Sequence, residues 1–305
     1  ITLNGSTYAA GTYRILTVTN APSIAGSSLS LTGGGTGNNT IGAGSSVTVG
    51  RTSYSFQTNA GNANAYDYVV AGQVVPVKWS GASGNWVSDQ SNTSNWLKVS
   101  DSTADNFYAG DAVTFDTAAT VTTSGTISAG AVTISNASGS VGISGTQVAG
   151  TSLAKSGAGS ATVGSVAISG TTTVSDGTLT LSGGSLTGAI TVSGGSLTSS
   201  ATGAGGITVS GGTVAANAAI SGGATVSSGT LNANAVISGG ATVSGGTLNY
   251  GVANATSGIL TVSGGTVAIG ANNGSVTTLT LSGGGAITGS GGTLTTTTSN
   301  AFQKG

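Results

Sequence analysis

The chain of 305 residues has no cysteine, histidine, methionine or glutamate, and charged residues make up only 4% of it. Without cysteine and histidine, the usual Ser–His and Cys–His nucleophile pairs and the commonest zinc sites are excluded. Asp176 is the only acidic residue after residue 117, so this part of the chain has no carboxylate pair for glycoside hydrolysis. These absences predict that the protein is not an enzyme and carries no cofactor.

Charge of either sign is scarce. Six basic and seven acidic residues give a formal net charge of −1, which provides no field to attract nucleic acid or anionic lipid. No apolar run is long enough to cross a membrane, because glycine and serine interrupt each one. The lack of cysteine suits an exported bacterial protein that needs no disulfides. The chain begins at Ile1 without a signal peptide, as we expect of a processed or partial chain.

What the chain does contain is a repeated phrase. Thr-Val-Ser-Gly-Gly-Thr-Leu stands at 242–248, and close copies recur throughout the second half of the sequence. An apolar anchor returns every 17 to 19 residues, and a fixed period of strand and turn residues is typical of a β-solenoid. No window has the apolar period of a helix, and regular anchors with few charges argue against disorder. The anchors are Val174, Val192, Val209, Val226, Val243, Val262 and Leu281.

Residues 220–248 show how one coil is divided. Their apolar residues are spaced by 6, 5, 6, 6 and 5 positions, so we expect three short sides per coil, separated by glycine-rich corners. Because strand side chains alternate in direction, Val226 should point into the bore while Thr225 and Ser227 face solvent. Roughly ten coils would stack into a rod about 50 Å long. The predicted core adds Ile220, Leu231, Ile237 and Leu248 to the seven anchors.

Composition divides the chain into three regions. Ten of the thirteen charged residues and all three tryptophans precede residue 117. Residues 1–75 read as short alternating strands with turns, which predicts a small sandwich or irregular coils. Residues 76–116 form a tryptophan-rich segment, and residues 117–305 form the repeat rod of an all-β, parallel β-solenoid.

The aromatic residues directly before the repeats have two interpretations. An open solenoid end exposes an apolar bore and unpaired strand edges, which invite aggregation unless they are covered. Large rings at this point are suited to capping the bore, and we favour that role. The alternative is a carbohydrate platform, on which exposed ring faces stack against sugars. The residues concerned are Trp79, Trp86, Trp96 and Phe115.

Four aspartates in the same segment are the only candidates for a metal site. Asp101, Asp105, Asp111 and Asp116 lie close together in sequence, and calcium takes six to eight oxygen ligands, often from loop carboxylates. The EF-hand spacing and the glycine-rich nonapeptide of calcium-binding β-rolls are both missing. We therefore favour aspartates that cap turns or face solvent.

The aromatic segment and the repeats together resemble a known family. Trp-Ser-Gly-Ala-Ser-Gly-Asn-Trp at 79–86, Ser-Asn-Trp at 94–96 and Gly-Asp-Ala-Val-Thr-Phe at 110–115, followed by Thr-Val-Ser-Gly-Gly repeats, resemble the autotransporter-associated β-strand repeat proteins. Stretches between residues 9 and 72 resemble the segment that closes one repeat array in such proteins. The resemblance implies a right-handed parallel β-helix displayed outside Gram-negative or related bacteria, and it implies no catalytic residues.

These features predict an extracellular or cell-surface structural protein of a bacterium. We expect a subunit of a fibre, sheath or matrix that associates with itself head to tail. The array stands last and the closing segment first, so strand edges near residues 293–302 would meet residues 1–20 of a neighbouring copy. The alternative is an adhesin, or a carbohydrate-binding passenger region of a larger surface protein, with cell-surface glycans as its partner.

Overall fold

The computed structural model describes residues 2–4, 11–17, 28–32, 39–42, 44–49, 51–59, 61–72, 74–81, 83–87, 95–203 and 205–302. The chain forms two compact units, Ile1–Val75 and Pro76–Gly305, and each is described by itself. The tryptophan-rich segment belongs to the second unit, where it supplies the first strands of the rod.

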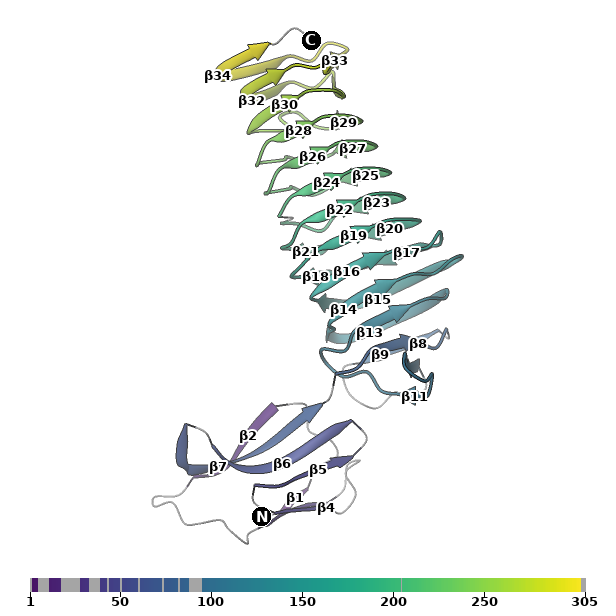
Figure 1. Ribbon diagram of the computed structural model, residues 1–305, viewed down its shortest axis with the longest axis vertical. Helices are drawn as coiled ribbons and strands as arrows, with labels where there is room; N and C mark the ends of the chain where they lie inside the picture. The colour runs from purple at the N-terminus through teal and green to yellow at the C-terminus, as the bar shows by residue number, and fades with distance from the viewer. Residues whose placement is uncertain are drawn as a thin grey trace. The chain divides into compact units, whose positions relative to one another are not determined.

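The second unit is a parallel β-solenoid of about ten coils (Figure 1), which confirms the predicted fold class. One long side of the rod, here called sheet 1, has fourteen strands. In spatial order they are β11 (Ala104–Asp105), β10 (Trp96–Lys98), β8 (Val77–Trp79), β12 (Val113–Phe115), β14 (Ala131–Ile134), β16 (Ser152–Lys155), β19 (Thr172–Val174), β22 (Ile190–Val192), β24 (Ile207–Val209), β26 (Ala224–Val226), β28 (Ala241–Val243), β30 (Ile259–Val262), β32 (Gly274–Leu281) and β34 (Leu294–Phe302).

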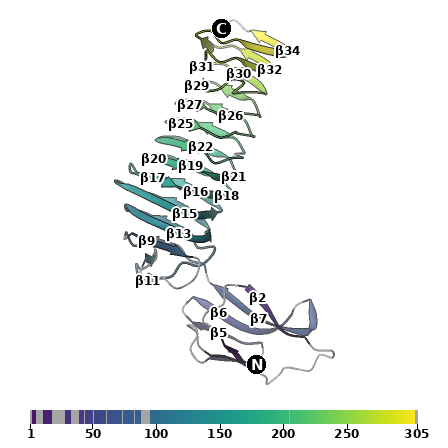
Figure 2. The same ribbon diagram turned by 180° about the vertical axis from the view of Figure 1, so that it is seen from behind.

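The second long side, sheet 2, has thirteen strands. Figure 2 shows the molecule from behind, with strands of this sheet labelled along the rod. The path of sheet 2 is β21 (Gly184–Leu186), β18 (Val166–Ile168), β15 (Ser140–Gly150), β17 (Ser160–Val163), β20 (Thr178–Leu181), β23 (Ser196–Ser199), β25 (Thr213–Ala216), β27 (Thr230–Ala233), β29 (Thr247–Tyr250), β31 (Thr266–Gly270) and β33 (Ala286–Gly289), and β13 (Ala119–Ser128) and β9 (Gly84–Val87) join it through β15.

The third side of the rod forms a ladder only in its first coils, where β13, β15, β18 and β21 pair in turn. The long strand β15 bends, so that one half pairs with β17 and the other with β18. In later coils this side is reduced to single bridges, Ile220 with Ile237 and Ile237 with Thr256. The three apolar positions per coil in the sequence therefore correspond to two ladders and one row of bridges.

In-register stacking explains why the same residue types recur. Val209, Val226 and Val243 are direct partners on adjacent strands, and the side chain of Val226 is 0% exposed. Thr225 and Ser227 on either side of it are exposed, as strand alternation requires. Ten of the eleven predicted core residues are buried in this way: Val174, Val192, Val209, Ile220, Val226, Leu231, Ile237, Val243, Leu248 and Val262.

Leu281 differs from the prediction because it is only half-buried. It lies on β32 and pairs with Phe302 on β34, the last strand of sheet 1. The register between these two strands shifts between Val276 and Thr278. An anchor side chain is fully buried where complete coils pack on both sides of it. Leu281 has only the strand β34 on its outer side, and its side chain therefore stays partly exposed.

Glycines at the corners let the coils approach each other closely. A Cβ added to Gly222 would lie 1.6 Å from the carbonyl oxygen of Gly205 on the preceding coil. A Cβ on Gly239 would lie 2.5 Å from the backbone nitrogen of Gly223. No side chain fits at such separations, so the Ser-Gly-Gly corners are set by coil stacking.

The first unit contains two smaller sheets. An antiparallel sheet has the order β2 (Gly11–Thr17), β7 (Asn62–Gly72), β6 (Thr52–Asn59) and β5 (Ser46–Val49). In the other, β1 (Thr2–Asn4) pairs parallel to β3 (Ser28–Thr32), which pairs antiparallel to β4 (Asn39–Gly42). The core of this unit consists of Ile41, Tyr54, Phe56, Tyr66, Tyr68 and Val70.

Candidate functional site

An aromatic cluster fills the first coils of the rod, and we call it the aromatic cap. Trp79, Trp86, Trp96 and Phe115 come from β8, β9, β10 and β12, and all four side chains are buried. The rings of Trp79 and Trp96 meet edge to face, with centroids 5.0 Å apart. Phe107 joins the cluster, 5.3 Å from Trp86. These separations are those of favourable aromatic pairs.

Backbone pairing closes the same end of sheet 1. β10 runs antiparallel to β8, and β11 runs antiparallel to β10. The reversed strand β10 and the strand β11 outside it therefore lie over the parallel ladder. This arrangement favours the capping interpretation of the aromatic residues. Sugar stacking needs an exposed ring face, and the buried rings of Trp79 and Trp86 offer none.

Three of the four candidate calcium ligands, Asp101, Asp105 and Asp111, bind nearby backbone nitrogens. Asp101 accepts hydrogen bonds from the backbone nitrogen of Thr103, at 2.9 Å, and from its hydroxyl, at 2.6 Å. These two bonds lower the pKa of Asp101. Asp105 accepts from the backbone nitrogen of Asn106 at 2.8 Å. Both carboxylates stabilise turns, as aspartates commonly do.

The other two aspartates lie in different surroundings. Asp111 is fully buried and accepts a hydrogen bond from the backbone nitrogen of Tyr108 at 2.8 Å. Asp116 is exposed, and its carboxylate lies 3.9 Å from the ammonium of Lys78. In the described part of the chain, no three histidine, cysteine or acidic side chains are grouped so that they could hold a metal ion. The structure therefore does not bring the four candidate ligands together.

Lys155 is a buried charge that the sequence analysis did not single out. It occupies an inward position of sheet 1 between Ile134 and Val174, and it is 1% exposed. Its ammonium donates to the carbonyls of Ser156 at 2.7 Å and Gly157 at 2.5 Å. Burial lowers the pKa of Lys155, and the nearby Asp176 opposes that shift. The sequence contains one signal for this site: Lys155 stands 19 residues before the anchor Val174, at a position where the repeat otherwise has an aliphatic residue.

We predict that the hydrocarbon stem of Lys155 matters more than its charge. Lys155→Met should keep the free energy of unfolding within about 1 kcal/mol of the wild type, because apolar replacements of buried charges are often neutral. Lys155→Ala should lose about 2–4 kcal/mol through the cavity it leaves. Chemical denaturation of both variants measures this difference, and equal losses would contradict it.

The same lysine should make stability depend on alkaline pH. Its pKa in the folded chain lies below the ordinary value of 10.5, so the unfolded chain binds the proton more tightly. Between those two pKa values, the free energy of unfolding should rise with pH. Lys155→Met should abolish this rise, which repeated denaturation across that window would show.

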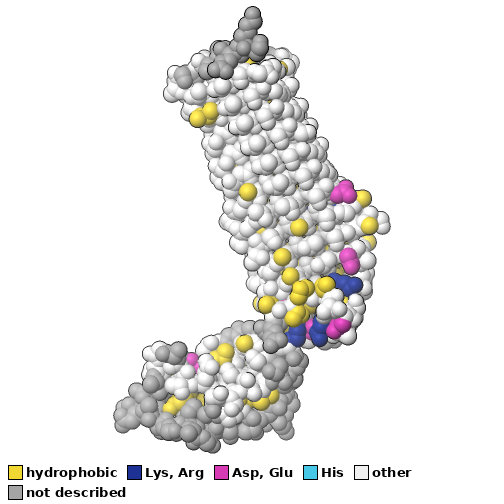
Figure 3. All heavy atoms as spheres, viewed as in Figure 1, with side chains coloured by type: hydrophobic (Ala, Val, Ile, Leu, Met, Phe, Trp, Pro, Cys, Tyr) yellow, Lys and Arg dark blue, Asp and Glu magenta, His cyan; other side chains and the backbone are white. Residues whose placement is uncertain are grey.

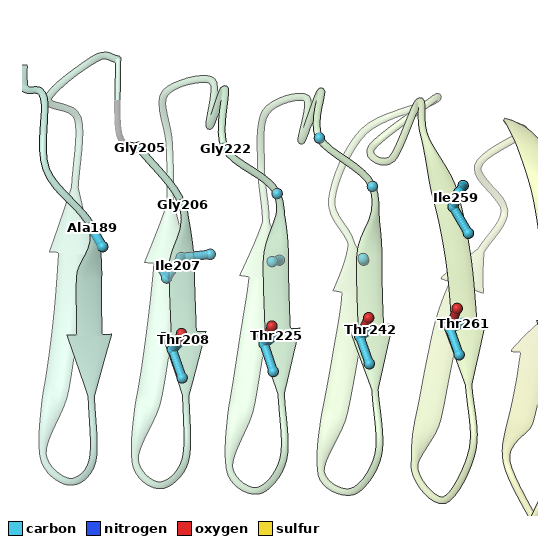
Figure 4. A pocket seen from close by; sticks show the side chains of 15 residues that line it. Ala189, Gly205, Gly206, Ile207, Thr208, Gly222, Thr225, Thr242, Ile259 and Thr261 are labelled. Carbon is cyan, nitrogen blue, oxygen red and sulfur yellow. The ribbon is translucent and has the colours of Figure 1, made fainter.

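A shallow trough runs along one corner of the rod beside sheet 1. Its volume is about 490 Å³, and all of its lining residues are uncharged. Corner glycines such as Gly206, Gly223 and Gly240 line one part of it. Ala189 and Ile259 lie at its two ends (Figure 4). The wall toward sheet 1 is a row of threonines, Thr208, Thr225, Thr242 and Thr261.

Charged side chains on the view in Figure 3 gather over the lower part of the rod, near the aromatic cap. Residues 177–302 contain none. Within the residues that the structure describes, no helix is long and apolar enough to span a membrane. Comparisons with protein-family models, curated proteins and solved structures found no match.

Proposed function

We propose that the chain is a structural component of a bacterial surface fibre, sheath or extracellular matrix, of the autotransporter-associated β-strand repeat type. The observation that carries the proposal is a continuous parallel ladder built on an aliphatic core, with an aromatic cap at the end that precedes the repeats. Such a rod provides length and stiffness, and its repeat region, residues 117–305, contains only three charged residues, Lys155, Asp176 and Lys304. Its role would be mechanical and non-enzymatic.

The two ends of the rod differ in a way that suits head-to-tail assembly. At one end, the reversed strand β10, the strand β11 outside it and the aromatic cap cover sheet 1. At the other, β34 is the outermost strand of sheet 1, and its outer edge has no partner among the described residues. An extended strand can bind such an edge through main-chain hydrogen bonds.

The first unit offers a matching strand. β1 is the outermost strand of its sheet and pairs parallel to β3. We propose that β34 of one copy pairs with β1 of the next, which would continue a parallel ladder across the junction. A contact between two different surfaces does not close on itself and therefore propagates into a filament. The strand β34 itself carries no charged residue, so its side chains add no electrostatic repulsion between the copies.

We expect the purified chain to form filaments in negative-stain electron microscopy, with an axial repeat near the length of one copy. Thr297→Lys places a charge on an exposed position of β34, and charged side chains protect sheet edges from pairing. This variant should shorten or abolish the filaments. Thr213→Lys, at an exposed position on β25 in the middle of the rod, is the matched control and should assemble normally. Monodisperse rods of the wild-type chain at high concentration would overturn the proposal.

A further inference from the structure

The outer face of sheet 1 carries two parallel ranks of hydroxyl groups, here called the threonine–serine grid. Each of seven successive strands presents a threonine, and a serine follows it two residues later. The threonines are direct partners from strand to strand. The first rank is Thr173, Thr191, Thr208, Thr225, Thr242, Thr261 and Thr280, and the second is Ser175, Ser193, Ser210, Ser227, Ser244, Ser263 and Ser282.

The spacing of the grid is set by the backbone. Adjacent strands lie about 4.8 Å apart, and positions i and i+2 of a strand lie about 6.6 Å apart. The backbone hydrogen bonds of the ladder continue through the serine rank. The backbone nitrogen of Ser227 donates to the carbonyl of Val209 at 2.9 Å, and that of Ser244 donates to the carbonyl of Val226 at 3.0 Å. No register shift interrupts sheet 1 from β19 to β30. The grid is therefore regular over these six coils.

The hydroxyl groups of the first rank are not used inside the protein. None of the seven threonine side chains makes a hydrogen bond to another described residue, and most of them are exposed. Figure 4 shows Thr208, Thr225, Thr242 and Thr261 one after another along the rod, in the same orientation. Each position thus offers one methyl group and one free hydroxyl group at a fixed interval, beside the uncharged trough.

The outer face of sheet 2 is a natural comparison, because only one of its two ranks is hydroxyl-bearing throughout. That rank is Ser160, Thr178, Ser196, Thr213, Thr230, Thr247 and Thr266. The second outward rank of sheet 2, two residues further along each strand, is interrupted by Ala215 and Ala268. Asn232 and Asn249 bond to each other at 2.8 Å and so satisfy part of their own polar groups. Side chains that bind one another are less available to an external lattice. Two adjacent ranks that both carry hydroxyl groups on every strand are therefore a property of sheet 1.

We propose that the threonine–serine grid binds ice. Ice is a neutral solid whose surface repeats water molecules at intervals of a few ångströms, comparable to those of the grid. Hydroxyl groups can replace lattice waters as donors and acceptors, while the methyl groups hold the water between them in ordered positions. An uncharged face disturbs such a layer least. The face offers no exposed aromatic ring, so it lacks the stacking surface that favours sugars.

The experiment measures ice growth in the presence of the purified 305-residue chain. The wild type should slow ice recrystallisation and depress the freezing point below the melting point. Thr225→Tyr puts a bulky side chain in the centre of the grid and should lose most of both effects. Thr213→Tyr, on the outer face of sheet 2, where only one rank carries hydroxyl groups on every strand, should retain them. Both variants should melt at the wild-type temperature, because both threonines are exposed.

Two results would overturn the proposal. One is a wild-type chain that leaves ice growth unchanged, or a Thr213→Tyr variant that loses as much as Thr225→Tyr. The other is binding to an insoluble neutral polysaccharide that Thr225→Tyr abolishes while ice growth is unaffected, which would assign the grid to glycans. Filament assembly, scored on the same samples by microscopy, should not change with Thr225→Tyr, so this test is independent of the proposed assembly.

Discussion

Val226→Asp is expected to destroy the middle of the rod. Val226 is fully buried between Val209 and Val243 in one column of sheet 1. A carboxylate at this point would lose its hydration, and residues 177–302 contain no cation that could pair with it. An unpaired buried charge costs several kcal/mol even after the structure relaxes, which is comparable to the whole stability of many domains.

Circular dichroism during thermal unfolding measures the effect, and hydrogen exchange locates it. Because each coil contacts only its neighbours, protection should be lost first in the coils on either side of β26. Thr225→Asp is the matched control, one residue away on the outer face. Its side chain is exposed, so the melting temperature should hardly change. A Val226→Asp variant as stable as Thr225→Asp would mean that the column is not a dry core.

The repeated coils could be predicted from sequence because each position recurs in the same surroundings. Val226 and Thr225 have opposite burial in one coil, and the alternation repeats in the next, so a local pattern is reinforced many times. The 6-5-6 spacing placed Ile220 and Ile237 on a third side, where the structure has their bridge. Leu281 departs from the pattern because the repetition stops one strand later.

The segment before the repeats could not be predicted in the same detail. Asp101 and Asp111 have the same side chain and lie ten residues apart in the same segment, yet one is exposed and the other fully buried. Their burial differs because strands that are distant in sequence pack over one of them and not the other. Such packing produces no periodic pattern in the sequence. Lys155 shows the converse case. The pattern marks its position as core, and a lysine is admitted because its ammonium reaches two turn carbonyls.

Trp86→Ala is expected to open the capped end of the rod. Trp86 is 0% exposed, and its ring contacts Trp96, Phe107 and Phe115 at centroid separations of 5.2, 5.3 and 5.7 Å. Removing a buried tryptophan side chain typically costs about 3–5 kcal/mol. The loss should appear as early hydrogen exchange in β8, β9 and β12, while the coils beyond β19 keep their protection, because stability passes only between neighbouring coils.

Trp86→Phe is the control that separates packing from polarity. The indole nitrogen of Trp86 is buried without a hydrogen-bond partner, so phenylalanine removes an unsatisfied donor while it keeps an aromatic ring in the cluster. We expect a much smaller loss than for alanine. If both variants lost exchange protection along the whole rod, the solenoid would unfold as one cooperative unit. If neither lost any, the aromatic cluster would not be what holds this end closed, and the antiparallel strands β10 and β11 alone would protect it.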